Sequence, residues 1–582
     1  LIRGQLREEN VAGATMSVVK DGRLVFAKGY GYADLEEREP VVADRTLFYP
    51  GSAGKLFTWT AVMQLVEEGK LDLDADINTY LDFEVPDTYD QPITMSHLMT
   101  HTAGLEEQLI ALLAEDRQDV LPLRDFLTRY MPQRVYPPGE YFAYSNYGTA
   151  LAGYIVQRVS GESYEQYIEE NILKPLDMER SAATQTLPEN LADDLSNGYH
   201  YQNGTYDAKD FEWISAAPAA PVHVTAPDMA KFMLAHLQNG EYNGARILEE
   251  NTALSMHRQH FTHDPRLPGM AYGFVTSQEN DQRVIWHMGE SARFTTVVAL
   301  LPEQNAGLFV SYNTPFDASQ TLSAFLDHYY PLQEEISATQ SPPGMADQTG
   351  RLAGTYITTR VAHNSPQKII GWLATEQVSV VNDNTLQVGE RRYARAEPEL
   401  FKQVDGERLL TFREDSQGQV THLFWGPFAF FKVAPYETLG FQLPLLAVCV
   451  ALFVSALVVF PVAALVDRWR SVPAKSSGTV RASRAARWLA GVTGVLNLGL
   501  LAWFVVTLLG YAQTYVWPTG TVSAITRLWL LSVPLTVGVV VFAALAWKNR
   551  FWGVIGRVHY ALVALASIMF LLFLYSWNLI GL

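Results

Sequence analysis

Four long apolar stretches in the last quarter of this chain constrain its fold more than any other feature. Residues 441–466 contain no charged side chain, and residues 488–510, 528–547 and 558–582 are almost as apolar. About 20 helical residues cross the hydrocarbon core of a bilayer, and each stretch reaches that length. Helices buried in a soluble core keep a polar stripe, which these stretches lack. We therefore predict a membrane domain of four transmembrane helices at residues 441–582.

The charges between these stretches predict their orientation. The segment after the first stretch and the segment after the third are rich in Lys and Arg, whereas residues 511–525, between the second and third, carry no charge. Positively charged loops stay in the cytoplasm. We therefore expect a multi-pass protein of the plasma (inner) membrane, with residues 1–440 extracytoplasmic. The chain begins at Leu1 rather than Met, and we expect that a secretion signal has been removed.

Overall charge and cysteine content exclude several kinds of partner. The net charge is −18 even though the tail from Asp467 onward is basic, so residues 1–440 are strongly acidic. We therefore expect no nucleic acid partner. Cys449 is the only cysteine and lies in the first apolar stretch, which excludes an intrachain disulfide and a cysteine metal cluster. The histidines show no metal-ligand spacing, and we expect no metal and no cofactor.

The remaining sequence divides into two parts. Residues 1–335 begin with a predicted hairpin at 16–32, continue through helical patterns and end in strand patterns. The helices are predicted at 52–68, 149–159, 164–172 and 226–237, and the late strands at 283–287, 295–301 and 307–312. This order predicts an α/β domain whose sheet is completed by both ends and flanked by helices. Residues 345–436, after a change of pattern near Ser341, alternate like short strands and predict a small antiparallel β-barrel or sandwich.

The segment Ser52-Ala-Gly-Lys55 carries the first chemical signal. Residues three apart on a helix share one face, so the amine can reach the hydroxyl. A serine hydroxyl is a poor nucleophile until a neighbouring group takes its proton, and a desolvated lysine can do so. Ser17-Val-Val-Lys20 has the same spacing, but on a strand its two side chains point to opposite faces. Only the helical pair has workable geometry.

Two further segments complete a possible site. Tyr144-Ser-Asn146 places a phenol and an amide on the same side of an extended segment. The phenol can exchange protons with the serine, and the amide can hold a substrate carbonyl. His287-Met-Gly289 ends an apolar strand, where a glycine leaves room for a ligand backbone. The next amide, that of Glu290, could pair with the amide of Ser52 as an oxyanion hole.

In this order the three segments resemble the motifs of class C β-lactamases, DD-peptidases and related esterases, the penicillin-binding-protein-like serine hydrolases. Three other segments resemble the same family over about residues 10–330: Leu98-Met-Thr-His-Thr-Ala-Gly-Leu105, Pro138-Gly-Glu-Tyr-Phe-Ala-Tyr-Ser-Asn-Tyr147 and Ile172-Leu-Lys-Pro-Leu-Asp-Met178. The resemblance implies a β-lactamase/transpeptidase-like sheet flanked by helices, with a helical lobe. It also implies that Ser52 is acylated, that Lys55 and Tyr144 move protons, and that Asn146 positions the substrate.

The sequence departs from the family pattern in two places. His287 stands where many relatives have the lysine of Lys-Thr-Gly, which weakens the case for binding a penicillin carboxylate. Arg293 replaces a glycine that relatives have before the phenylalanine, here Phe294. One hypothesis is that Arg293 clamps a substrate carboxylate; the alternative is an exposed arginine without such a role.

The combination of this family with C-terminal spans is similar, in outline, to membrane-bound peptidases that remove an acyl-D-amino-acid cap from peptide prodrugs. We therefore expect an enzyme, a serine hydrolase acting on a small peptide or acyl substrate through an acyl-enzyme, and favour a D-amino-acid-type or prodrug-maturing peptidase. A carboxylesterase of the same fold and a slowly acylating sensor that signals through the membrane helices remain alternatives. The sequence leaves the oligomeric state open.

Overall fold

The computed structural model describes residues 1–582 apart from 210–211, 221, 333–348, 470–476 and 581–582. The described residues form two compact units. The first unit comprises Leu1–Arg360 and Glu376–Lys432, and the second comprises Val361–Thr375 and Val433–Leu582. The change of sequence pattern near Ser341 lies outside the described residues.

A seven-stranded antiparallel sheet forms the centre of the first unit, with the strand order β10-β11-β12-β13-β1-β2-β3. The strands are β1 (Gly13–Lys20), β2 (Arg23–Asp34), β3 (Glu39–Pro40), β10 (Val275–Glu279), β11 (Gln282–Glu290), β12 (Thr295–Leu301) and β13 (Ala306–Tyr312). Strand β1 pairs with β13 along its length, from Ala14 opposite Tyr312 to Lys20 opposite Ala306. The prediction that both ends of the domain complete one sheet is therefore confirmed.

The hairpin between β1 and β2 follows from its turn residues. Asp21 and Gly22 both adopt positive φ, 50° and 79°, which is the backbone of a type I′ turn and matches the twist of the strands. Ser17 and Lys20 lie on this hairpin. Ser17 is fully buried, whereas the Lys20 amine is partly exposed and pairs with Asp21 at 3.2 Å. The serine–lysine pair on the strand therefore has no joint chemistry, as predicted.

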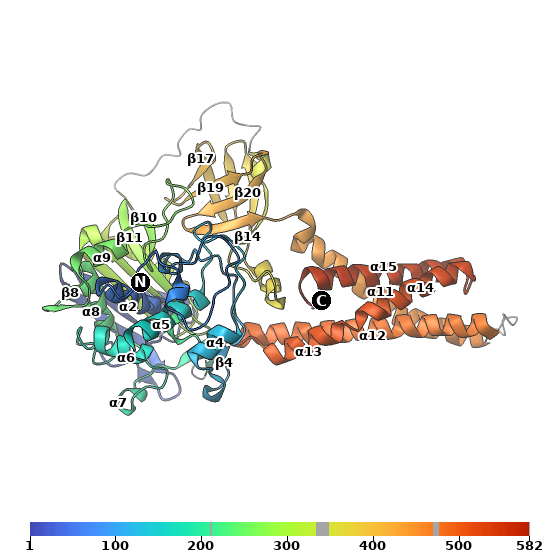
Figure 1. The fold of residues 1–582 in the computed structure, drawn as a ribbon, viewed down its shortest axis with the longest axis horizontal. Helices are drawn as coiled ribbons and strands as arrows, with labels where there is room; N and C mark the ends of the chain where they lie inside the picture. Colours follow the sequence, from blue (N-terminus) through green and yellow to red (C-terminus); the bar gives the residue numbers. More distant parts are fainter. Residues whose placement is uncertain (210–211, 221, 333–348, 470–476, 581–582) are drawn as a thin grey trace. The chain divides into compact units, whose positions relative to one another are not determined.

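Helices cover both faces of the sheet (Figure 1). On one face, α1 (Ile2–Glu8) and α10 (Ser319–Tyr329) join sheet residues such as Val297 and Leu308 in one apolar cluster. On the other face, α8 (Ala226–Leu237) packs on β1 and β13 and belongs to a larger cluster that continues into the helical lobe.

The helical lobe contains the elements that position the predicted site. Its helices include α2 (Lys55–Glu67), α5 (Asn146–Ser160) and α6 (Tyr164–Ile168). The helix predicted at 52–68 opens as a 3₁₀ turn, Gly51–Gly54, before α2 begins. Every residue of α2 from Lys55 to Leu65 is buried, so the lysine at its first position is shielded from solvent.

Strands β14 to β21 close into a barrel within the first unit. They are β14 (Gly354–Thr358), β15 (Thr375–Asn382), β16 (Thr385–Val388), β17 (Arg391–Glu397), β18 (Leu400–Gln403), β19 (Leu409–Glu414), β20 (Val420–Trp425) and β21 (Phe428–Lys432). Of the two predicted architectures, the barrel is the one that forms. Residues 361–375, which follow β14 and end at the first residue of β15, belong to the second unit.

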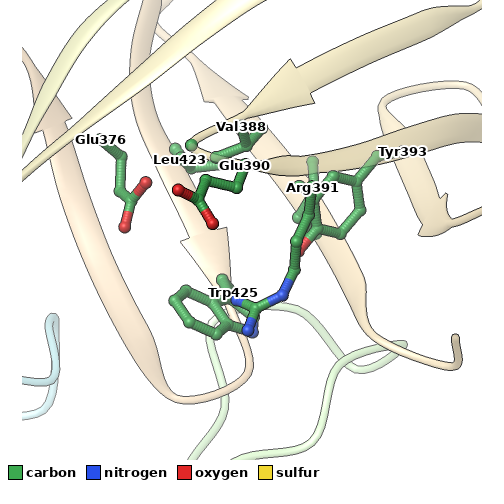
Figure 2. A pocket seen from close by; sticks show the side chains of 9 residues that line it. Glu376, Val388, Glu390, Arg391, Tyr393, Leu423 and Trp425 are labelled. Carbon is green, nitrogen blue, oxygen red and sulfur yellow. The ribbon is translucent and has the colours of Figure 1, made fainter. Parts of the chain in front are cut away.

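The barrel encloses a cavity of about 380 Å³. Figure 2 shows the carboxylates of Glu376 and Glu390 on one side of it, with Arg391 extending toward Trp425. Its lining shares no residue with the three sequence motifs.

The second unit consists mainly of long apolar helices. They are α11 (Leu439–Trp469), α12 (Ser477–Thr514), α13 (Thr519–Trp529), α14 (Ser532–Lys548) and α15 (Val554–Ser576). Within the part of the chain that the structure describes, four segments are long and apolar enough to cross a membrane: Leu439–Val466, Gly478–Ala512, Thr519–Lys548 and Val554–Ser576. The third combines α13 and α14. Large apolar side chains such as Val462, Val506 and Leu565 are exposed, as expected for helices whose outer surface faces lipid.

Candidate active site

Ser52 and Lys55 form the centre of the candidate site. The Lys55 Nζ donates hydrogen bonds to Ser52 Oγ at 2.8 Å and to the Ala219 carbonyl at 2.7 Å. Lys55 is completely buried, and this burial, assisted by the charge of Arg360, holds its pKa well below the usual value. A neutral amine at this position can take the Ser52 proton while it keeps its bond to Ala219.

The turn that carries Ser52 lies directly against strand β11. A Cβ atom on Gly289 would lie 1.7 Å from the Pro50 carbonyl oxygen, so only glycine permits this approach. The sequence predicts that Gly289 leaves room for a ligand backbone. In the structure, the turn before Ser52 fills that room, and the glycine fixes the height of the serine above the sheet.

Tyr144 lies beside this pair. Its hydroxyl is buried and makes no hydrogen bond within 3.5 Å among the described residues, although Ser52 is close enough to lower its pKa. Burial outweighs that effect and raises the pKa of Tyr144 to about 12. The Lys55 Nζ lies 5.0 Å from the centre of the Tyr144 ring. Burial therefore favours the neutral form of both groups, by lowering the pKa of Lys55 and raising that of Tyr144. The roles of Lys55 as base and Tyr144 as proton donor stay predictions.

Asn146 lies at the start of a capped helix. It is the first residue of α5, and Ser145 caps that helix by accepting a hydrogen bond from the Gly148 N–H at 2.9 Å. Tyr144 and Asn146 therefore flank a single capping residue, which fixes the backbone at both. The role of Asn146 in holding a substrate carbonyl stays a prediction.

His287 is buried and neutral. Its Nδ1 donates to the Met288 carbonyl at 2.6 Å, which leaves Nε2 as an acceptor. Burial and the neighbouring Lys55 lower the pKa of His287 to about 3. The ring centre lies 6.2 Å from that of Tyr144. His287 thus belongs to the same cluster but supplies no fixed positive charge at pH 7.

Glu290 and Arg293 lie beyond the end of the motif. The backbone of Glu290 runs beside Gly51, where an added Cβ would lie 3.2 Å from the Glu290 nitrogen. This places the Glu290 amide next to the turn that holds Ser52, and the oxyanion role stays a prediction. The Arg293 side chain packs against Gly198. Burial raises the pKa of the nearby Glu212, and the charge of Arg293 offsets part of that rise. The carboxylate clamp at Arg293 also stays a prediction.

Sequence reasoning missed several groups around Tyr144. The His101 ring lies 4.3 Å from the Tyr144 ring, and burial holds the pKa of His101 well below its usual value. The Arg360 guanidinium lies 4.8 Å from the Tyr144 ring and forms an ion pair with Glu107. His101 lies in the family-like segment 98–105 and could have been found. Arg360 follows a barrel strand and carries no sequence signal.

Comparison with known proteins identifies the family of this unit. Residues 1–327 match the family model described as Beta-lactamase. The chain belongs to the beta-lactamase family. Members of this family with the β-lactamase/transpeptidase fold are generally serine hydrolases, which fits the serine–lysine pair described above.

Two kinds of relative are similar to this family member. Protein flp of Staphylococcus aureus strain N315 is 28% identical over 318 residues, which cover 54% of this chain and 62% of that protein. The unguisins hydrolase ungD' of Aspergillus campestris is 26% identical over 349 residues, 56% of this chain and 63% of that protein. The chain thus spans about three fifths of the length of these curated relatives.

Solved structures support the fold. SurE superposes with a TM-score of 0.54 at 23% identity, covering 74% of this chain and 97% of SurE. The octameric penicillin-binding protein homologue from Pyrococcus abyssi gives a TM-score of 0.50 at 22% identity, covering 74% of this chain and 98% of that one.

Proposed function

We propose that this protein is a membrane-anchored serine hydrolase that cleaves an amide or ester through an acyl-enzyme on Ser52. The 2.8 Å contact between the buried Lys55 Nζ and Ser52 Oγ carries the proposal. The Ser52 oxygen attacks the substrate carbonyl carbon while its proton passes to Lys55. The leaving amine or alcohol departs with a proton supplied by Tyr144 or Lys55, and water then releases the acyl group from Ser52.

The proposal places the hydrolase unit outside the cytoplasm. The support is the basic character of the segments after the first and third apolar stretches. At that location, exported peptides and cell-wall peptides are the accessible substrates. We therefore propose a peptidase acting on D-amino-acid-type bonds or on a peptide prodrug.

A carboxylesterase of the same fold is the second candidate. It is favoured by the neutral His287, because many carboxylate-binding relatives have a lysine at that position. The third candidate, a slowly acylating sensor, would use the same Ser52 chemistry without turnover. Multiple turnover of a chromogenic ester, as opposed to one stoichiometric burst, separates an enzyme from this sensor.

Labelling of intact cells with a membrane-impermeant fluorophosphonate tests the nucleophile and its location together. We expect one label per chain in the wild type and none in Ser52→Ala, because only the hydroxyl next to Lys55 is activated. Intact-mass analysis after purification counts the labels. Turnover of a panel of D- and L-amino-acid amides and simple esters then distinguishes a peptidase from an esterase.

Ser17→Ala is the matched control. Its hydroxyl is buried without a hydrogen bond among the described residues, so its removal leaves labelling and turnover unchanged. Label retained in Ser52→Ala contradicts the assigned nucleophile. Label that appears only after the cells are opened contradicts the extracytoplasmic location.

A further inference from the structure

The segment that carries Arg360 is attached firmly to the loop that carries Tyr144. Thr359, just before Arg360, is buried, and its N–H donates to the Ala429 carbonyl of β21 at 2.9 Å. Its hydroxyl donates to the Phe142 carbonyl, and its own carbonyl accepts from the Tyr136 hydroxyl at 3.4 Å. The backbone before Arg360 is therefore bonded both to the barrel and to the motif loop.

Aromatic contacts extend this attachment. Tyr141 stacks on His422 at 4.7 Å between ring centres, and Phe142 meets Phe428 edge-on at 5.5 Å. His263 stacks on Phe424 at 4.3 Å. Because the barrel residues pack on the residues just before Tyr144, the barrel holds the Arg360 guanidinium at a fixed place over the Tyr144 ring.

The basic side chains near Ser52 differ in their accessibility to a substrate. Lys55 is completely buried and bonded to Ser52 and Ala219. His287 is neutral. The Arg360 side chain, by contrast, keeps 40% of its surface exposed, while its partner Glu107 keeps 10%. Glu107 is held from behind, because its second oxygen accepts from the Gln108 N–H at 3.1 Å.

We propose that Arg360 forms a carboxylate-binding subsite of this enzyme, supplied by the barrel to the edge of the hydrolase site. The substrate class is an ester or amide that carries a free carboxylate near the scissile bond. The substrate carboxylate binds the exposed side of the guanidinium. Without substrate, Glu107 alone serves as the counter-ion of Arg360. An arginine fits this role because its planar guanidinium can hold a carboxylate through two parallel hydrogen bonds. This inference rests on the hydrolase function proposed above.

Two matched ester pairs test the subsite on the full-length chain in detergent. On the acyl side, mono-4-nitrophenyl succinate is compared with the 4-nitrophenyl ester of succinamic acid. On the leaving-group side, an acetyl ester of 4-hydroxybenzoate is compared with that of 4-hydroxybenzamide. In Arg360→Ala, we expect the KM of the carboxylate member of one pair to rise about 10-fold to 100-fold relative to the KM of its amide partner, the loss typical of a charge-assisted hydrogen bond. The lost effect of the Arg360 charge on the pKa of Lys55 acts on both members of a pair alike and cancels in this ratio.

Glu107→Gln should change the KM of the carboxylate substrate in the opposite direction to Arg360→Ala. Removal of the competing carboxylate leaves the Arg360 charge unneutralised, so the KM of the same carboxylate substrate falls severalfold. If the Arg360–Glu107 pair had only a structural role, both variants would instead raise the KM of the carboxylate substrate alike.

Arg413→Ala is the matched control. Arg413, on β19, lies 5.4 Å from the ring of Tyr141, three residues before Tyr144, so its loss disturbs the same barrel–loop contact without reaching Tyr144. It should leave the carboxylate-to-amide ratio of KM at the wild-type value.

Fluorophosphonate labelling separates the two possible failures. If wild-type Ser52 is not labelled, the hydrolase function itself is wrong. If Ser52 is labelled in the wild type and in Arg360→Ala, yet both members of each pair change equally or not at all, the carboxylate subsite is wrong and the hydrolase function stands.

Discussion

At the scale of single residues, burial shifts the pKa values of the groups around Ser52. Burial lowers the pKa of Lys55 well below its usual value and raises that of Tyr144 to about 12, so it favours the neutral form of both groups. The neighbouring His287 is neutral as well, with its pKa lowered to about 3. A buried cluster without net charge avoids the desolvation cost of an isolated ion. Under the proposed function, the lowered pKa suits Lys55 to act as a base and the raised pKa suits Tyr144 to donate a proton.

Gly289→Ala tests the close approach of strand β11 to the turn that carries Ser52. The added methyl group would lie 1.7 Å from the Pro50 carbonyl oxygen, a backbone atom that no side-chain rotation can move away. We expect a loss of about 3 kcal/mol of stability, the upper part of the range for overpacking, and at least about a tenfold slower labelling of Ser52. Chemical denaturation and labelling rate measure the two effects.

Gly350→Ala is the control, because no atom of the described residues lies within 4 Å of the place where its Cβ would be added. Wild-type stability and labelling in Gly289→Ala would show that the turn is not fixed by this contact.

At the scale of elements, a helix cap links the motif loop to the helical lobe. Helix α5 begins at Asn146, and its capping residue Ser145 lies between the two residues of the second motif. The Ser145 N–H also donates to His101 Nδ1 at 3.3 Å, beside the ring that packs on Tyr144. The start of α5 thus sets the position of the phenol.

Ser145→Ala should lower both stability and activity. Loss of the cap costs about 1 kcal/mol, and the freed backbone at Tyr144 and Asn146 lowers kcat severalfold. Ser163→Ala removes the equivalent cap of α6, where Ser163 accepts from the Gln166 N–H at 3.2 Å, and should cost similar stability with unchanged kcat. Equal kcat in the two variants would contradict the role of the α5 cap in the site.

At the scale of the whole first unit, a partly buried histidine lies between the barrel and the loops of the hydrolase part. His263 Nε2 accepts from the Phe142 N–H at 3.3 Å, while its ring stacks on Phe424 of β20. Burial, with help from Arg413, lowers the pKa of His263 to about 3, whereas an unfolded histidine has a pKa near 6.5. The neutral ring is therefore part of what holds the two parts together.

This contact should weaken in acid. Because the pKa of His263 is lower in the folded protein, its contribution is complete above about pH 6.5 and is lost as pH falls toward 3, by up to about 1.4 kcal/mol per pH unit. Hydrogen–deuterium exchange of peptides containing Phe142 and Phe424 should be corrected for intrinsic exchange rates. Their protection should then fall up to about tenfold for each unit by which the pH is lowered.

His263→Gln, which cannot be protonated in this range, should flatten that dependence, and His328→Gln, at an exposed position on α10, should not. The same slope in all three proteins would show that His263 does not govern the contact.

The sequence by itself determined the features that depend on local patterns. The hairpin around Asp21-Gly22, the boundaries of α8 and β12, and the four apolar segments follow from periodicity, turn residues and hydropathy. The pair Ser52 and Lys55 was predictable for the same reason, because one helical turn places them together. The preference for the helical pair over Ser17 and Lys20 also needed only strand geometry.

Tertiary structure alone decided the groups that reach the site from distant segments. The Arg360 guanidinium meets Tyr144 because barrel strands pair through long-range hydrogen bonds, and no local pattern around residue 360 encodes that pairing. Gly289 faces Pro50 for a similar reason. The protonation states of Lys55 and His287 likewise depend on burial by residues far apart in the chain, since desolvation is a property of the packed interior.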